Sequence, residues 1–447
     1  MGGGLMQLVA YGAQDIYLTC NPQITFFKVV YRRHTNFSME SIKQTFDGTA
    51  DYGRSVSATI SRNGDLVYRM YLEHDASIQA TEDPGFGNQD TIATGVDYGS
   101  HVMKECEIEI GGQQIDKHYG HWHSVYSQLT EFNPSGAVDT LFHRMVGNGR
   151  GAAVDAGSAV GSNHPGWTTV SGDSGRRVKK GKFWIPFYFW FCRNPGLALP
   201  LIALQYHEVK VKVTFEDIVN LGGTALGAST FYENTGTLSV ANNIISSETK
   251  FALWCDYIYL DTDERRRFAQ VSHEYLIEQL QYSSLSGKNK YELQLNHPVK
   301  ELIWSGKRGN RVIDADQDDP YEMFERNNIS GAGKFQLKLN GHDRFTARDY
   351  KYFTRTQVWE HHTGYGSLPN AAEASWAADA VRKGNDTIAV YSFALKPEEH
   401  QPSGTCNFSR IDNAELTMTT ATDLNLYAVN YNVLRIMSGM GGLAYSN

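Results

Sequence analysis

Short segments in which polar and apolar residues alternate constrain the fold of this chain more than any other feature. The clearest examples lie at 105–110, 208–215, 334–339 and 415–419. An alternation with a period of two places apolar side chains on one face only, as in an antiparallel strand whose other face meets water. The segment at 334–339 leads into Asn340-Gly341, a pair favoured in tight hairpin turns. The sequence therefore predicts an all-β fold built from antiparallel sheets.

Two other patterns supplement these strands. The segment at 182–191 is apolar on both faces, which predicts a strand buried on both sides or lying at a subunit contact. Helices are expected to be few and short. One helical face is indicated by four apolar residues spaced three, four and three apart: Trp122, Val125, Leu129 and Phe132. A second helix is expected after Asp261, which can cap it with Glu264 at the third helical position.

The two halves of the chain share an order of features that indicates an internal repeat. Four pairs keep the same order: 67–71 with 300–304, Gly112 with Gly341, Phe189 with Phe393, and Glu208 with Glu415. Each half is long enough for about eight short strands, and a repeated all-β unit of that size favours a sandwich over an open sheet. The sequence therefore predicts two consecutive eight-stranded antiparallel jelly rolls.

The expected organisation has three parts. We assign an N-terminal segment to 1–25, the first jelly roll to 26–217 and the second jelly roll to 218–447. Two irregular segments, at 133–181 and 354–385, are rich in small or polar residues and are expected to be long surface loops.

Composition excludes several classes of protein. The 447 residues include 41 Lys and Arg against 49 Asp and Glu, and the net charge of −8 argues against nucleic acid as a direct partner. No apolar run reaches the roughly 18 residues of a membrane-spanning helix, and the N-terminus lacks the pattern of a secretory signal. The five cysteines are scattered without a C-x-x-C pair, which predicts reduced, mostly buried thiols.

Motifs for catalysis or metal binding are incomplete. His118, His121 and His123 lack a glutamate at the spacing of a jelly-roll metal enzyme, so we expect structural or surface histidines. The acidic segment at 314–318 has calcium-loop spacing with Glu325, but the glycine required at its sixth position is absent. We therefore expect no catalytic residues, no cofactor and no metal.

Surface signals are weak. Sequons for glycosylation occur at Asn36, Asn328, Asn385 and Asn407, and Asn385 and Asn328 are the candidates we retain. The run at 176–182 holds five cations, which fits a solvated strand entry better than a polyanion site on an acidic chain.

Several longer segments resemble the major capsid proteins of the nucleocytoplasmic large DNA viruses, most closely those that infect algae. The resemblance opens with GAQDIYLT at 12–19 and includes FCRNPGLALP at 191–200. Further matching segments lie at 21–28, 31–37, 111–116, 256–261, 403–410 and 428–435. They are distributed over nearly the whole chain, and several are long enough to be specific.

The resemblance implies a structural role. It implies a double jelly roll, three copies of which form a nearly hexagonal capsomer that tiles an icosahedral shell. It implies no catalytic residues, localisation in the virion capsid and assembly in the host cytoplasm. The implied partners are other copies of the chain, minor capsid proteins under the shell and a penton protein. The long loops would face outward, where they could carry glycans or meet host-surface glycans.

Three alternatives stay open at this stage. A carbohydrate-binding jelly roll would use exposed aromatic residues beside acids, and Trp359, Trp376 and Tyr365 near Glu360 and Asp379 are the best candidates. A cupin-type enzyme would show a stoichiometric bound metal. A minor capsid paralogue would share the same motifs, because copy number is not encoded in them.

Overall fold

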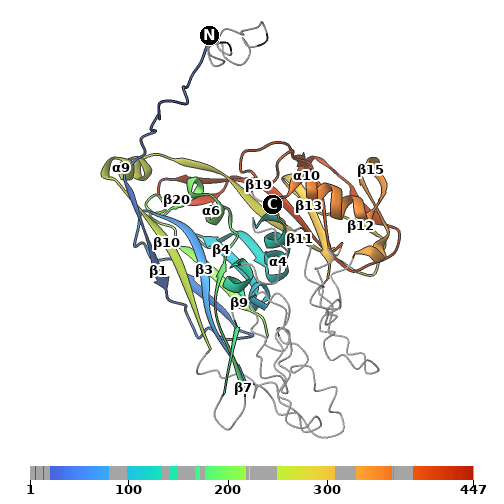
Figure 1. Cartoon of the computed structure of the whole chain (residues 1–447), viewed down its shortest axis with the longest axis horizontal. Helices are drawn as coiled ribbons and strands as arrows, with labels where there is room; N and C mark the ends of the chain where they lie inside the picture. The colour runs from blue at the N-terminus through green and yellow to red at the C-terminus, as the bar shows by residue number, and fades with distance from the viewer. Residues whose placement is uncertain are drawn as a thin grey trace. The chain divides into compact units, whose positions relative to one another are not determined.

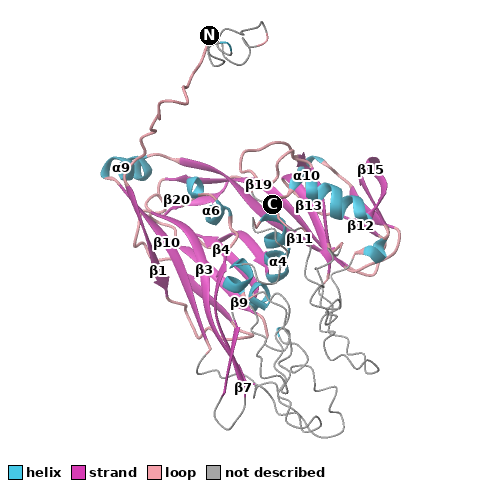
Figure 2. Ribbon diagram, in the orientation of Figure 1, coloured by secondary structure: helices cyan, strands magenta, loops and turns pink. Residues whose placement is uncertain are grey.

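The computed structural model describes a defined part of the chain. The described residues are 6, 14, 21–79, 98–131, 141–147, 167–171, 177–217, 221, 249–307, 329–364, 366 and 386–445. The chain separates into two compact units, Met1–Phe37 and Ser38–Asn447. The first unit exposes large apolar side chains, including Ile24, Phe26 and Phe27. The second unit carries the sheets, which dominate the architecture (Figure 2).

The first half of the second unit is a sandwich of two antiparallel sheets (Figure 1). Its larger sheet has the order β1-β10-β3-β7-β6, with β8 beside β3, and its smaller sheet has the order β2-β9-β4-β5. The strands are β1 (Phe37–Gln44), β2 (Ser55–Thr59), β3 (Leu66–Gln79), β4 (Met103–Ile110), β5 (Gln113–Tyr119), β6 (Trp167–Ser171), β7 (Arg177–Pro186), β8 (Leu199–Pro200), β9 (Val209–Phe215) and β10 (Lys250–Leu260).

The second half is another sandwich of the same kind. Its larger sheet has the order β11-β19-β13-β16, with β17 beside β13 and β20 beside β19, and its smaller sheet has the order β12-β18-β14-β15. The strands are β11 (His273–Leu285), β12 (Lys290–Glu292), β13 (Pro298–Gly306), β14 (Lys334–Leu339), β15 (His342–Asp349), β16 (Ile388–Ser392), β17 (Cys406–Asn407), β18 (Ala414–Met418), β19 (Leu424–Met437) and β20 (Met440–Leu443).

The two sandwiches have the same strand order. When β6, β8, β17 and β20 are set aside, each larger sheet contains the first, eighth, third and sixth strands of its half. Each smaller sheet contains the second, seventh, fourth and fifth. This alternation of consecutive strands between facing sheets is the jelly-roll arrangement, with eight such strands in each half of the described chain. The predicted repeat is confirmed, because 67–71 and 300–304 lie in the equivalent strands β3 and β13.

The helices are short. The α-helices in the described part of the chain are α3 (Tyr98–Val102), α4 (Gly120–Thr130), α5 (Leu141–Val146), α6 (Trp190–Arg193), α9 (Thr262–Gln270) and α10 (Gln357–His361), which follows a π-helical turn at Tyr352–Thr356. Helix α4 confirms the helix predicted from the spacing of Trp122, and the Thr262 amide donates to Asp261 Oδ1 as the predicted cap. Among the described helices, none has the length and apolar composition needed to cross a membrane.

Three expectations about individual segments need correction. The predicted strand at 182–191 ends at Pro186 and is followed by helix α6, and Trp184 is 40% exposed, so the strand is not buried on both faces within the chain and the alternative of a subunit contact stays a prediction. The two expected loops also contain regular structure, because α5, β6 and the beginning of β7 lie within 133–181 and α10 lies within 354–385. The polar residues of β7 form a strand because they pair with the long strand β3, and β6 in turn pairs with β7, contacts that local composition does not report.

The expected boundary at 217 also separates a strand from its sheet. Strand β10 lies beyond that position, yet it pairs with β3 from Lys250 opposite Asp75 to Ile258 opposite Leu66, and it also lies beside β1. A jelly roll closes by pairing its first and last strands, which are far apart in sequence. The pairing therefore assigns β10 to the first jelly roll.

Candidate functional site

Helix α4 is positioned between the two jelly rolls. It begins directly after β5, and Gly120 is required at this turn because a Cβ there would lie 2.6 Å from the Met103 carbonyl oxygen. Trp122, Val125 and Leu129 recur on one face of the helix and are all buried. The helix therefore presents a continuous apolar stripe.

This stripe packs against the second jelly roll. The shared cluster joins side chains of α4 to the outer face of the larger sheet of the second jelly roll, namely Ile303, Ile388, Val390, Tyr427 and Val429. Burial of this apolar surface supplies the main stabilisation of the junction, at roughly 25 cal/mol for each Å² removed from water. The two jelly rolls are thus joined through a packed core.

Polar contacts fix the register of the junction. The Leu280 amide of β11 donates to Asp116 Oδ1 of β5 at 3.0 Å, and His121 Nδ1 lies 2.8 Å from the Tyr427 hydroxyl. The turn before β20 also reaches back to the first jelly roll, where the Tyr206 amide donates to the Gly439 carbonyl at 2.9 Å. These directional bonds restrict rotation of one jelly roll against the other.

A buried ion cluster crosses the same junction. Glu278 of β11 forms ion pairs with two cations, Arg193 (Nη2 to Oε2, 2.6 Å) and Lys300 (Nζ to Oε1, 2.8 Å). The side chains of Glu278 and Lys300 are almost fully buried. Burial alone would raise the pKa of Glu278, but the positive charges of Arg193 and Lys300 lower it to about 2. The carboxylate therefore stays charged, and it holds cations from both jelly rolls.

A second buried ion cluster lies within the second jelly roll. His362 Nε2 is 3.1 Å from Glu301 Oε2, and its Nδ1 is 3.0 Å from Glu398 Oε1. Burial would lower the pKa of His362, but the two carboxylates outweigh it and raise the pKa to about 9. His362 is therefore protonated at neutral pH.

Among the residues that the structure describes, no helix covers the outer face of the larger sheet of the first jelly roll as α4 covers that of the second. Tyr71 and Trp254 stack with ring centroids 6.5 Å apart, and Lys182 lies 2.5 Å from Glu73 and near the ring of Trp184. Beside these residues is a cavity of about 770 Å³, also lined by Arg69 and Arg193. Such a surface, aromatic and partly charged, can bind another protein surface.

Two family profiles match the chain in sequence order. A profile described as "Major capsid protein N-terminus" matches residues 25–261, and one described as "Large eukaryotic DNA virus major capsid protein" matches residues 264–442. The chain belongs to the major capsid proteins of large eukaryotic DNA viruses. The fold predicted from the sequence, a double jelly roll, is confirmed with this assignment.

Individual relatives agree over their full lengths. The major capsid protein of Pyramimonas orientalis virus is 50% identical, and that of Phaeocystis pouchetii virus is 41% identical, each alignment covering 100% of both chains. A chain of the PBCV-1 virus capsid superimposes with a TM-score of 0.69 at 34% identity, covering 95% of this chain and 100% of that one. This capsid protein is thus a structural component of the virion shell.

The predicted site residues of the capsid protein have separate fates. His121 contacts Tyr427, whereas the rings of His118 and His123 lie beside each other, with His118 also contacting Asp116 and His123 contacting Cys106. The sequence predicted structural or surface histidines at all three positions, and the structure buries His118 and His123. Cys106, which contacts His123, was not among the predicted site residues, because it lies on β4 and has no informative spacing to the histidines in the sequence.

Other predicted features fall in different places. The sequons at Asn328 and Asn385 and the acidic segment at 314–318 lie outside the described residues, so the glycosylation prediction stays a prediction. Lys182, from the basic run, forms ion pairs with Glu73 and Asp75 across the sheet.

Proposed function

We propose that three copies of this capsid protein form a nearly hexagonal capsomer that tiles an icosahedral shell. One observation carries the proposal: two jelly rolls of the same strand order are joined by helix α4, which covers the larger sheet of the second, whereas the described residues leave the larger sheet of the first open. A closed ring of three chains would repeat this junction between subunits and cover the open sheets.

The second jelly roll carries a candidate for the covering element. Helix α10 follows β15 in the chain as α4 follows β5, and both helices therefore occupy the same place in the repeat. Trp359 of α10 is 82% exposed. In the capsomer, we infer that Trp359 packs against the outer face of β3, β7 and β10 of the next chain, near Trp184 and Trp254.

The mass of the purified chain in solution tests the assembly. Light scattering should give about three times the chain mass of 50.1 kDa, and electron microscopy of the same fraction should show a three-cornered, nearly hexagonal outline. A monomer or a twofold dimer under conditions where the chain is folded would contradict the proposal.

Finer aspects of the function follow from the family resemblance. We propose that the base of the capsomer contacts minor capsid proteins and that neighbouring trimers meet a penton protein at the vertices. Assembly is proposed in the host cytoplasm, without direct contact to nucleic acid, consistent with the net charge of −8. We further propose a domain division between β10 and β11, and outward loops that carry glycans or meet host-surface glycans.

Crosslinking coupled to mass spectrometry of purified virions tests these partners. The residues of α9 and of 21–36 should crosslink to minor capsid proteins, whereas residues beside the loops at 133–181 and 354–385 should remain reactive towards reagents added outside the shell. The opposite distribution would contradict the proposed orientation.

A further inference from the structure

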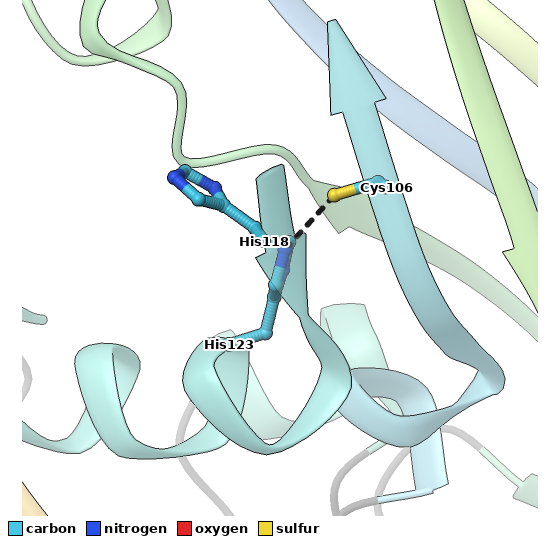
Figure 3. A group of neighbouring side chains, drawn as sticks. All are labelled: Cys106, His118 and His123. Atoms are coloured by element: carbon cyan, nitrogen blue, oxygen red, sulfur yellow. Dashed lines mark hydrogen bonds between the residues drawn. The ribbon is translucent and has the colours of Figure 1, made fainter. Parts of the chain in front are cut away.

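A buried group of three metal-ligand side chains lies beside the junction. Cys106 comes from β4, His118 from β5 and His123 from α4, and all three are almost fully buried (Figure 3). One donor atom from each lies within 4.8 Å of the others. A thiol with two imidazoles is a donor set that zinc prefers in proteins.

The fold brings these residues together for clear reasons. Cys106 and His118 are directly opposite each other in the antiparallel pairing of β4 and β5, so their side chains share one face. Helix α4 begins immediately after β5, and its first turn carries His123 back over that face. Residues that sequence spacing separates are therefore neighbours in space.

The donor atoms of Cys106 and His123 are already separated by the distance expected for two ligands of one metal ion. Sγ and Nε2 are 3.5 Å apart (Figure 3). Two donors bound tetrahedrally to zinc, with bonds of about 2.3 Å to sulfur and about 2.0 Å to nitrogen, lie about 3.5 Å apart.

His118 supplies an independent observation. Its Nε2 lies 2.9 Å from Asp116 Oδ2, and because a carboxylate accepts, this nitrogen carries the proton. Its Nδ1 is left with a lone pair, and this atom is buried with no hydrogen-bond partner. A histidine that binds a metal through one nitrogen while a carboxylate holds the other is the usual arrangement around zinc.

Asp116 is itself held in place. Its Oδ1 accepts from the amides of Lys117 at 2.9 Å and Leu280 at 3.0 Å, and both of its oxygens are therefore engaged. Asp116 consequently orients His118 from behind rather than binding a metal directly. Because Leu280 belongs to the second jelly roll, the group is mechanically connected to the junction.

We propose that Cys106, His118 and His123 bind one zinc ion that stabilises the first jelly roll beside the junction. Donor atoms that now lie within 4.8 Å of one another would draw together to about 3.5 Å around the ion. Three protein ligands leave the fourth position of a tetrahedral zinc ion for a water molecule, and the burial of the three ligands assigns the ion a stabilising role. The inference does not depend on the proposed trimer.

Metal analysis of the full chain tests the site. The chain would be produced in zinc-containing medium, purified and assayed by mass spectrometry for metals, and one zinc per chain is expected. Production in cobalt-containing medium should give the intense near-ultraviolet thiolate band and the visible bands of tetrahedral cobalt. A folded chain that holds no zinc above the buffer blank, or cobalt without a thiolate band, would overturn the proposal.

Variants then assign the ligands. Cys106→Ser and His118→Asn should lose the zinc and the thiolate band, whereas Cys255→Ser, a matched cysteine fully buried in the same core, should keep both. If Cys106→Ser still binds one zinc per chain, Cys106 is not a ligand and the proposed site is wrong. If the ligand variants do not fold, the cobalt spectrum of the unmodified chain decides the question alone.

Discussion

The outer faces of β3 and β13 belong to equivalent strands of the two jelly rolls, yet they have opposite surroundings. β13 is buried along nearly its whole length, because α4 covers its outer face with apolar side chains. On β3, Tyr71, Glu73 and Asp75 point outward and are only partly buried. The same topology thus produces one face that is completed within the chain and one that is not.

This difference shows what the repeat contributes to a shell protein. Under the proposed assembly, the junction inside the chain corresponds to a contact that one chain makes with the next. The covered face has Ile303 where a sheet core needs apolar surface, and the open face has Trp184 and Trp254 mixed with charged residues. A face that mixes aromatic and charged side chains can stay soluble in the free chain and still bind another chain on assembly.

The largest loss of stability should come from truncating Trp122, the large aromatic side chain by which α4 packs on the covered face. Trp122 is 3% exposed and packs 5.1 Å from the rings of Tyr126 and Tyr427. Trp122→Ala should lower the free energy of unfolding by about 4 kcal/mol, because it leaves a large cavity at the junction. Urea unfolding followed by circular dichroism measures it, and a loss below about 1 kcal/mol would show that α4 is not essential to the covered face.

The ion cluster at the junction should rank next. Glu278→Gln leaves Lys300 buried and Arg193 partly buried without their counter-charge, and the free energy of unfolding should fall by about 3 kcal/mol. The matched control is Glu399→Gln, which removes the exposed partner of Lys396 and should produce no measurable change. Equal unfolding curves for the two variants would show that the junction does not depend on this charge.

A third effect concerns the covered face and pH. Because the pKa of His362 is raised from its ordinary value of 6.5 to about 9, its stabilising contribution is complete below pH 6.5 and disappears as pH rises through 9. The loss should reach at most about 3 kcal/mol. Urea unfolding at several pH values should show a weaker dependence in this range for His362→Gln, and an unchanged dependence would contradict the role of His362. Lys182→Gln, at the open face, is the control.

The strand pattern of this fold could be predicted from sequence, whereas its closure could not. Alternation marks the strands β4, β9, β14 and β18, since one face of each is buried in its own sandwich. The pattern fails at β10 and at 182–191. The pairing of β10 with β3 and the start of α6 at Trp190 depend on contacts distant in sequence.

The candidate site was harder to predict from the sequence than the strands, for a related reason. Spacing along the chain compared His118, His121 and His123 with one another, whereas the structure pairs His123 with Cys106 of β4 and His121 with Tyr427 of β19. Cys106 carries no local signal, because only the register of β4 against β5 places it opposite His118. Glu278 and Arg193 likewise meet only when the two jelly rolls pack.

The substitution Trp359→Ala should change the stability of the single chain least, yet it should weaken the assembly of three chains strongly. Trp359→Ala removes a side chain that is 82% exposed, so the free energy of unfolding should change by less than about 0.5 kcal/mol. If Trp359 covers the open face of the next chain, the trimer dissociation constant should rise on the order of 30-fold, as for a central aromatic contact. Native mass spectrometry across a dilution series measures this shift. Trp184→Ala should act similarly and combine with Trp359→Ala less than additively, whereas Val271→Ala, an exposed apolar control, should leave the trimer intact. Additive effects would mean that the two tryptophans lie at separate contacts, and the equivalence of the two junctions would then be wrong.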